Sequence, residues 1–299
     1  MSSADLPPEA AGRLEAATFS SGLSVADFAA CLQMGMRPVG LVQGYCVMKW
    51  SWYGTGSPYA SSVYWASGGQ GGTLSSYQCP HGFGYGMGIS DHRSWGSNIE
   101  QPWVTQAWAS GYNSAYQRMV EEAQQAGAHG VIGVIDSSSH LVEGAIREFH
   151  MYGTAVVVED SEAPPTVWTT YLAGQRLAKL VEVGYFPVSV VSSMASVRVW
   201  SVCETEILLR GGYDSWGAVR PTDEIVQVAD AEMQARRLAR DHLRSALGHD
   251  MLQGVELDIG WHEISEGDFE RQCTLKGTRV RRVRDADPLP TPVPTVNLR

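Results

Sequence analysis

A cysteine and two histidines lie near one another in a glycine-rich stretch of this chain. They are Cys79, His81 and His92, with Pro80 inside the first pair. A thiolate and imidazoles suit Zn²⁺ or another divalent soft metal, and a glycine-rich backbone could gather them around one ion. The spacing matches no recognised zinc motif, and a fourth ligand would have to come from Asp91 or from a neighbouring subunit. The alternative is a polar loop with incidental cysteine and histidine.

The same stretch is rich in aromatic residues. Between Trp50 and Tyr116 lie six tryptophans and seven tyrosines, interspersed with glycine and serine. This composition gives large contact area at a low cost in side-chain entropy and is typical of recognition surfaces. The candidates for partner binding or assembly are Trp50, Trp52, Trp65, Trp95, Trp103 and Trp108. The alternative is that these rings pack the segment onto its own domain or into an oligomer interface.

Motifs typical of enzymes are weak in this sequence. The alternating glycines of Gly82–Gly88 neither follow a clear strand nor open a helix, so a phosphate-binding loop is not expected. Glu204 and Glu206 would share one strand face and read as a solvated pair rather than an acid–base pair. A metal-dependent hydrolase would need a general base beside Cys79 and His81, and none is evident. We therefore predict no catalytic and no cofactor-binding residues.

The architecture follows from an internal repeat. Met34–Val42 reappears as Val183–Val191 at a constant offset of 149, and each copy follows a segment of helical pattern. Later landmarks recur in the same order, including Gly153-Thr154 as Gly277-Thr278. A tandem repeat of this length exceeds solenoid periods, so each copy is long enough to be a small domain.

Each copy reads as helix, strand, insertion, helix, strand, strand. Ser24 and Asp27 have capping-box spacing at the first helix, and Ser114 and Gln117 have it at the second. In the first copy the expected elements are helix 23–33, strand 39–47, a helix from about 114 to 127, and strands 131–135 and 144–159. In the second copy they are helix 172–183, strand 188–203, helix 223–247, and strands 253–259 and 269–283.

This order predicts an α+β chain made of two tandem two-layer units, each a small sheet covered by two helices. The units span residues 17–160, with a Trp/Tyr/Gly-rich insertion at about 51–112, and residues 165–284. The ends, 1–16 and 285–299, are expected to be flexible tails, because one is polar and the other carries four prolines. A sheet with one uncovered face and free edges is commonly completed by another copy.

The repeat landmarks resemble the YbjQ-like family of heavy-metal-binding domains. The resemblance rests on a helix ending in Ala123–Ala128, a Gly-Val-Ile-Gly strand at Gly130–Gly133, and a strand finishing at Gly153–Val156. It covers about 17–160 directly and about 165–284 only through the internal repeat, where Gly40 and Gly44 are replaced by serines. The resemblance implies a dodecin-like α/β unit that assembles into closed rings, typically pentamers. It supplies no ligand set for a metal.

Composition and charge limit the function classes. The net charge is −10, and residues 1–160 carry 6 basic and 13 acidic side chains, which does not favour nucleic-acid binding. No run of about 18 apolar residues exists, so no membrane span is expected. The N-terminus lacks the features of a signal peptide, and the five cysteines are irregularly spaced. These features favour a reducing, cytoplasmic setting.

Several other chemically notable residues are expected to be structural. Cys31 and Cys46 lie in apolar patterns and should behave as small hydrophobic side chains. His129 follows a helix end, where the helix dipole favours it. The arginines of 279–284 are interpreted as a solvated strand edge.

The favoured hypothesis is a non-enzymatic homo-oligomer of YbjQ-like type whose duplicated units form a ring. The aromatic insertion would line the lumen or bind a protein partner. The alternative is a soft-metal-binding protein that uses Cys79, His81 and His92. A metal-dependent hydrolase is the third hypothesis, and it has the least support from the sequence.

Overall fold

The computed structural model describes residues 20–49, 96–142, 146–201, 205, 208–209, 224–265 and 268–285. The predictions about the two tails and about the insertion up to Trp95 therefore fall outside the described residues. Within them the chain is a mixed α+β structure with four helices and two four-stranded sheets, which confirms the predicted fold class.

The first half of the chain, here called unit 1, carries two helices and four strands. They are α2 (Val25–Gln33), β1 (Met36–Lys49), β2 (Asn98–Glu100), α3 (Pro102–Gln125), β3 (Gly130–Val142) and β4 (Ile146–Val158). The second half, unit 2, begins after β4. Its elements are β5 (Trp168–Thr169), α4 (Gly174–Glu182), β6 (Tyr185–Trp200), α6 (Val226–Leu247), β7 (Met251–Ser265) and β8 (Asp268–Arg282).

The three long strands follow the same order in both sheets, and the short strand lies at opposite ends. Sheet 1 runs β1-β4-β3-β5 and sheet 2 runs β2-β6-β8-β7, with the three long strands antiparallel in each. Their irregularities also coincide. β1 shifts register between Pro38 and Gly40, and β6 shifts between Pro187 and Ser189. β3 and β7, which occupy matching places, each shift register at a glycine with positive φ, Gly133 at 59° and Gly254 at 66°. These glycines are where an L side chain would be strained.

Each unit contributes one short strand to the sheet of the other. β5 precedes α4 in unit 2, yet it pairs in parallel with β3 of unit 1. β2 precedes α3 in unit 1, yet it pairs antiparallel with β6 of unit 2. The two units are therefore interlocked through backbone hydrogen bonds rather than joined as separate beads.

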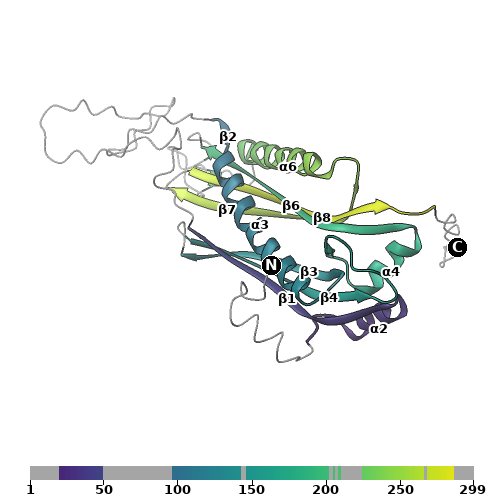
Figure 1. Ribbon diagram of the computed structural model, residues 1–299. Helices are drawn as coiled ribbons and strands as arrows, with labels where there is room; N and C mark the ends of the chain where they lie inside the picture. Colours follow the sequence, from purple (N-terminus) through teal and green to yellow (C-terminus); the bar gives the residue numbers. More distant parts are fainter. Residues whose placement is uncertain are drawn as a thin grey trace, which may run out of the picture.

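Each sheet packs against one long helix, and these contacts define the layers of the structure. α3 lies between the two sheets, and α6 covers the opposite side of sheet 2 (Figure 1). We call the face of a sheet that packs on its own long helix, α3 or α6, its inner face, and the opposite face its outer face. The short helices α2 and α4 lie together at one end, where Gln175 donates its backbone N–H to the Asp27 carboxylate at 3.0 Å.

The helix ends follow the predicted local signals in most places. Asp27 donates its backbone N–H to the Ser24 hydroxyl at 3.1 Å, which confirms the N-cap of α2. Gly35 and Gly127 adopt the left-handed conformation just after α2 and α3, at φ 68° and 69°.

The predicted start of the long helix in unit 1 was wrong. The helix begins at Pro102, not near Ser114, so the last part of the expected insertion is helical. Ser114 is not a cap, because its hydroxyl donates to the Ser110 carbonyl one turn back. The signal for the true start was present: Pro102 occupies a first-turn position, where proline lacks only an N–H that the helix does not use.

The arginines near the end of β8 do not lie on a sheet edge, because β8 is an interior strand. Arg281 makes a two-pronged contact with the Asp250 carboxylate, 3.0 Å at both oxygens, and Arg279 reaches the same carboxylate at 3.1 Å. Arg284 donates to the last carbonyls of α4. The group therefore ties turns and a helix end together instead of protecting an edge.

Candidate functional site

Most residues that the sequence nominated lie outside the part of the chain that the structure describes. This holds for the metal candidates Cys79, His81 and His92 and for the tryptophans Trp50, Trp52, Trp65 and Trp95. Across the described ranges, no group of three or more His, Cys, Asp or Glu side chains could hold a metal ion. The metal site thus stays a prediction about the insertion.

The two described tryptophans of the nominated set lie on α3. Trp108 is 4% exposed, stacks on Tyr112 at 5.1 Å between ring centroids, and meets Phe149 edge-on at 6.2 Å. Trp103 is half-buried and donates its indole N–H to Gln101 at 3.0 Å. Trp108 therefore packs within the protein, which was the alternative considered for these rings.

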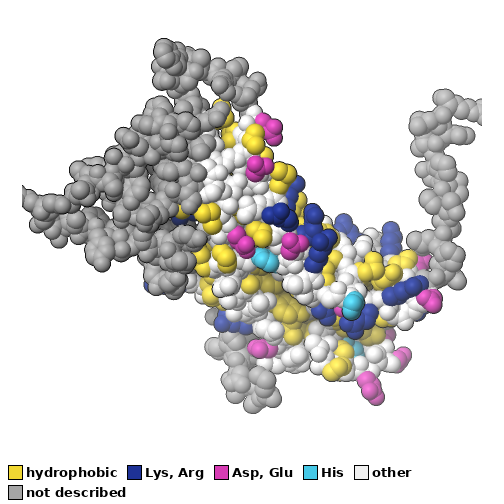
Figure 2. Space-filling view, turned by 90° about the horizontal axis from the view of Figure 1, so that it is seen from above, with side chains coloured by type: hydrophobic (Ala, Val, Ile, Leu, Met, Phe, Trp, Pro, Cys, Tyr) yellow, Lys and Arg dark blue, Asp and Glu magenta, His cyan; other side chains and the backbone are white. Residues whose placement is uncertain are grey.

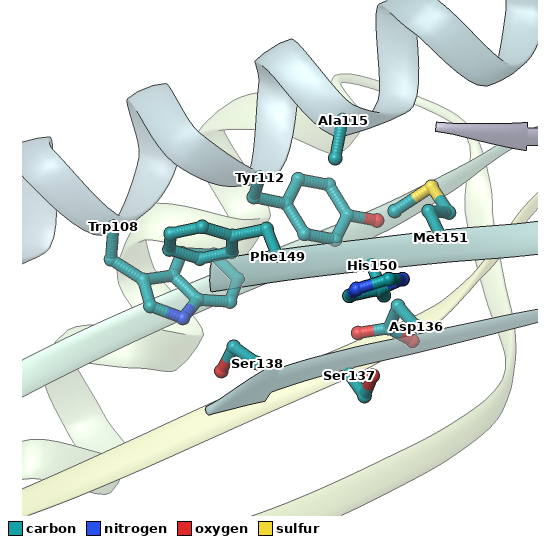
Figure 3. A pocket seen from close by; sticks show the side chains of 9 residues that line it. All are labelled: Trp108, Tyr112, Ala115, Asp136, Ser137, Ser138, Phe149, His150 and Met151. Carbon is teal, nitrogen blue, oxygen red and sulfur yellow. The ribbon is translucent and has the colours of Figure 1, made fainter. Parts of the chain in front are cut away.

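Beside these rings is a small cavity between α3, β3 and β4 (Figure 3). Trp108, Tyr112 and Phe149 form its apolar side, and Asp136 and His150 contribute polar atoms. Its volume is about 10 Å³, room for about one water molecule. Ligand pockets hold several hundred Å³, so this cavity is too small for a substrate.

Next to this cavity, a chain of polar side chains crosses from unit 1 to unit 2. The Tyr112 and Tyr171 hydroxyls are 3.0 Å apart, and Tyr171 is also hydrogen-bonded to Asp136. The Asp136 carboxylate accepts from Lys276 Nζ at 3.1 Å, and this ammonium lies 5.5 Å from the centre of the Tyr171 ring. Unit 1 supplies Tyr112 and Asp136, and unit 2 supplies Tyr171 and Lys276.

The titration behaviour of this chain fits a structural contact. Burial raises the pKa of Tyr112 and of Tyr171 far above the ordinary range, so both phenols stay protonated in water near neutral pH. Burial by itself would lower the pKa of Lys276, but the nearby carboxylates of Asp136 and Glu256 outweigh it and raise that pKa. The ammonium is therefore held charged between two carboxylates.

The contact between the units also has an apolar part. Val131, Val134 and Met151 on the inner face of sheet 1 share one core with α3 and with two outer-face residues of β6. Those two residues, Val190 and Met194, are 4% and 2% exposed. The outer face of sheet 2 thus covers the part of the inner face of sheet 1 that α3 leaves open.

The edge of β3 that faces away from β4 is covered at the same place. Trp168 and Thr170 donate their backbone N–H groups to the carbonyls of His129 and Val131, at 3.3 and 2.9 Å. In return, Val134 donates to the Thr170 carbonyl at 3.0 Å, and Gly133 donates to the Leu172 carbonyl at 3.1 Å. The edge of β3 is therefore paired, which removes a strand edge from solvent.

A comparable region of unit 2 is open. A groove of about 350 Å³ lies between α6 and the β7 side of sheet 2. Apolar and arginine side chains line it: Arg236, Arg240, Leu243, Arg244, Leu247, Leu252, Val255, Leu257 and Leu275. Val255 and Leu257 are 54% and 47% exposed, and no described strand pairs with the free edge of β7. Figure 2 looks down on the side of the molecule that carries α6 and shows Lys and Arg side chains gathered beside apolar ones.

This groove was not predicted from the sequence. The residues that line it alternate as in an ordinary half-buried strand, and the helix pattern of 223–247 gives only one core face. A signal did exist: Arg236, Arg240 and Arg244 recur every four residues and so form a basic stripe along one side of α6.

The two cysteines and the histidine that were predicted to be structural lie within the described residues. Cys31 and Cys46 are buried free thiols, and burial raises the pKa of Cys31 to about 11. His129 is buried, and its Nδ1 accepts the backbone N–H of Val158 at 3.2 Å. These observations confirm packing roles for all three.

Comparison with known proteins matches the last part of unit 1 to a family model. Residues 99–159, which span α3, β3 and β4, match the model of a family described as "Putative heavy-metal-binding". This segment is YbjQ-like. A 45-residue stretch is 47% identical to a UPF0145 protein of Acinetobacter baylyi; it is 15% of this chain and spans 41% of that relative's length.

A second relative matches almost the whole chain. An encapsulin nanocompartment protein of Mycobacterium tuberculosis is 25% identical over 294 residues, 94% of each chain. No solved structure matches this chain. In the described part of the chain, no helix is long and apolar enough to cross a membrane.

Proposed function

We propose that this chain is a non-enzymatic, self-assembling protein of the cytoplasm, built from two duplicated YbjQ-like units and acting as an assembly or binding scaffold. The observation that carries the proposal is the open groove and free β7 edge of unit 2, where Val255 and Leu257 are about half exposed. Exposed apolar surface next to an unpaired strand commonly marks a protein interface.

Three further observations support this function. The two sheets share the order of their three long strands, the bulges and the glycine breaks, as expected for copies of one unit. The YbjQ-like resemblance implies closed rings, typically pentamers, and a duplicated chain would place two units of such a ring in each subunit. The relative from Mycobacterium tuberculosis is named for a nanocompartment, which is a protein assembly, and it matches along almost the full chain.

The test is the mass of the purified protein across micromolar concentrations, by light scattering and native mass spectrometry. The chain has a mass of 32.5 kDa, and we expect one oligomer of defined size, whose mass is a whole-number multiple, at least two, of that value. A monomer throughout the concentration range would contradict the proposal.

A second candidate function is the binding of a divalent soft metal such as Zn²⁺ by Cys79, His81 and His92. It is favoured by the description of the matched family together with the Cys-x-His spacing in the insertion. Elemental analysis of protein purified without chelators should then find about one bound metal per chain, and Cys79→Ser should lower that content at unchanged oligomeric mass. Equal metal content in both proteins would contradict this function.

The tryptophans of the insertion are the proposed contact for a protein partner. Trp50, Trp52, Trp65 and Trp95 would supply rigid, amphipathic contact area there. A chain with all four replaced by serine should keep its oligomeric mass if these rings serve a separate partner. Loss of the oligomer would instead assign them to assembly.

A further inference from the structure

The residues of the contact inside the chain have counterparts on surfaces that stay exposed. Along the sheets, Tyr152 occupies in unit 1 the place that Lys276 occupies in unit 2, one residue before the shared glycines Gly153 and Gly277. Asp136 and Leu257 likewise correspond, since each is the third residue after the glycine break of its strand. The ion pair between Asp136 and Lys276 joins the two units of one chain, whereas Leu257 and Tyr152 are 47% and 37% exposed.

The groove of unit 2 corresponds to the buried core of unit 1. Leu252, Val255 and Leu275 stand where Val131, Val134 and Met151 stand in sheet 1. In unit 1 these three residues are covered by the outer face of sheet 2. In unit 2 nothing in the described chain takes that place, and the 350 Å³ groove results.

The surface that would fill the groove is also present and open. Val190 and Met194 of β6 correspond to Leu41 and Tyr45 of β1, at the offset of the internal repeat. The Tyr45 ring is 39% exposed on the outer face of sheet 1, and its hydroxyl donates to the Glu148 carboxylate at 3.1 Å. An aromatic ring with a bound carboxylate complements a groove lined by leucines and arginines.

The segments before α4 and before α2 are anchored in the same way. Before α4, the Tyr171 N–H donates to the Thr278 hydroxyl at 3.0 Å, and the preceding Thr170 hydroxyl bonds the same group. Before α2, the Gly22 N–H donates to the Thr154 hydroxyl at 3.1 Å, and the Ser21 hydroxyl lies 3.3 Å from it. The first segment continues directly from β5, which pairs with β3. The second segment has the same anchoring and no described strand partner.

We propose that the groove and β7 edge of unit 2 bind the outer face of sheet 1 and the segment before α2 of a second copy of this chain. The proposal rests on the self-assembly proposed above and names its contact. Because the two surfaces differ, the contact is head-to-tail, and repetition closes a ring if the rotation per copy permits. The same arrangement of sheets would then recur within and between subunits.

The test transplants the internal ion pair to the contact between subunits. Tyr152→Lys and Leu257→Asp each place one charge in the proposed apolar interface, so each alone should raise the dissociation constant by about tenfold or more. The double variant places Lys opposite Asp, as Lys276 and Asp136 stand at 3.1 Å, and should recover most of the wild-type affinity. Light scattering on dilution series and native mass spectrometry report the assembly.

Two controls separate assembly from folding. Val283→Asp introduces the same charge at a side chain that is 62% exposed beyond the groove, and its assembly should match the wild type. Thermal unfolding followed by circular dichroism should show that each single variant stays folded, because both altered side chains are solvent-accessible in the isolated chain.

The outcomes distinguish this proposal from the one on which it rests. A wild-type oligomer that both single variants leave intact, or that the double variant fails to recover, overturns the head-to-tail contact and leaves self-assembly standing. Dissociation by Leu257→Asp but not by Tyr152→Lys would mean that two grooves face each other, which also contradicts it. A monomeric wild type overturns both proposals. A small-molecule adduct lost on Leu257→Asp without a change in oligomeric mass would assign the groove to a ligand instead.

Discussion

The two units of this chain share a strand order but differ in how closely their long helices approach the sheet. In unit 1, α3 crosses β1 at Gly44, where a Cβ would lie 1.8 Å from the Ala115 carbonyl oxygen. In unit 2 the same place is taken by Ser193, whose hydroxyl donates to the Ala239 carbonyl of α6 at 2.8 Å. One strand position thus determines whether the helix lies on backbone or on a side chain.

The helices differ in what they bury. α3 buries large rings, with Trp108 and Tyr112 against Phe149. α6 buries a row of alanines against β6 and β8: Ala231, Ala235 and Ala239. The difference teaches that one topology tolerates two distinct cores. The units also differ in which of their surfaces remain open.

The largest expected effect concerns the close approach in unit 1. Gly44→Ala should destabilise the protein by about 3 kcal/mol, because the new methyl group overlaps the α3 backbone and the helix must move away. Chemical denaturation measures the loss. Gly40→Ala in the same strand is the matched control: nothing lies within 4 Å of its Cβ position, so stability should change little. Equal losses at both glycines would contradict the difference in packing.

The second prediction compares the two threonine anchors. Thr278→Val should cost about 2 kcal/mol, because it leaves the Tyr171 N–H without its acceptor inside the interface between units. Thr154→Val should cost about 1 kcal/mol in the monomer, because water can reach the segment at Gly22. Urea unfolding of both variants checks the ranking. If a second copy covers that segment, the cost at Thr154 should rise as assembly is favoured.

The third prediction concerns alkaline pH. The pKa of Lys276 is raised in the folded state, so its contribution is fully present below the unfolded value of about 10.4 and is lost as pH rises through the folded value. Unfolding free energies measured above about pH 10 should therefore fall more steeply in the wild type than in Lys276→Met, and the two profiles should run parallel between about pH 8 and 9.5. Near neutral pH the methionine variant should lose about 1 kcal/mol, since the ammonium is partly exposed. Profiles that stay parallel above about pH 10 would exclude the ion pair as a contributor.

The smallest expected effect is at acid pH and involves Asp250, which takes in unit 2 the place of His129 in unit 1. Hydrogen bonding by Arg281 lowers the pKa of Asp250, with further attraction from Arg279. Its contribution is present above the unfolded value of about 3.9 and is lost as pH falls through the folded value. The melting temperature of Asp250→Asn should accordingly depend less on pH below about 5 than that of the wild type. A slope equal to that of the wild type would contradict this role.

The sequence was informative wherever local chemistry fixes the backbone. Ser24, Gly35 and Gly127 mark helix ends in the structure as predicted, and apolar patterns located all six long strands. The start of α3 was misplaced because a capping-box spacing at Ser114 was preferred over the proline at Pro102. Serine in a helix interior can satisfy its hydroxyl on the preceding turn, so the spacing alone is ambiguous.

Contacts between distant segments could not be read in the same way. The exchange of β2 and β5 between the sheets depends on backbone edges, and any extended segment of suitable length can pair with an edge. The salt bridge of Asp136 with Lys276 joins residues 140 positions apart, and neither lies in a motif. The groove likewise consists of apolar positions on β7, β8 and α6 that the sequence pattern alone would assign to a closed core.

By itself, the sequence determined the class of the fold, the repetition of landmarks and the positions of turns, because those depend on residue type, period and glycine or proline chemistry within a few positions. Only the tertiary structure decided that the units exchange strands and that one inner face is covered while its counterpart is open. The physical reason is that side-chain burial depends on which surfaces meet in space, and the same alternation of apolar residues serves a closed core and an unfilled groove equally well.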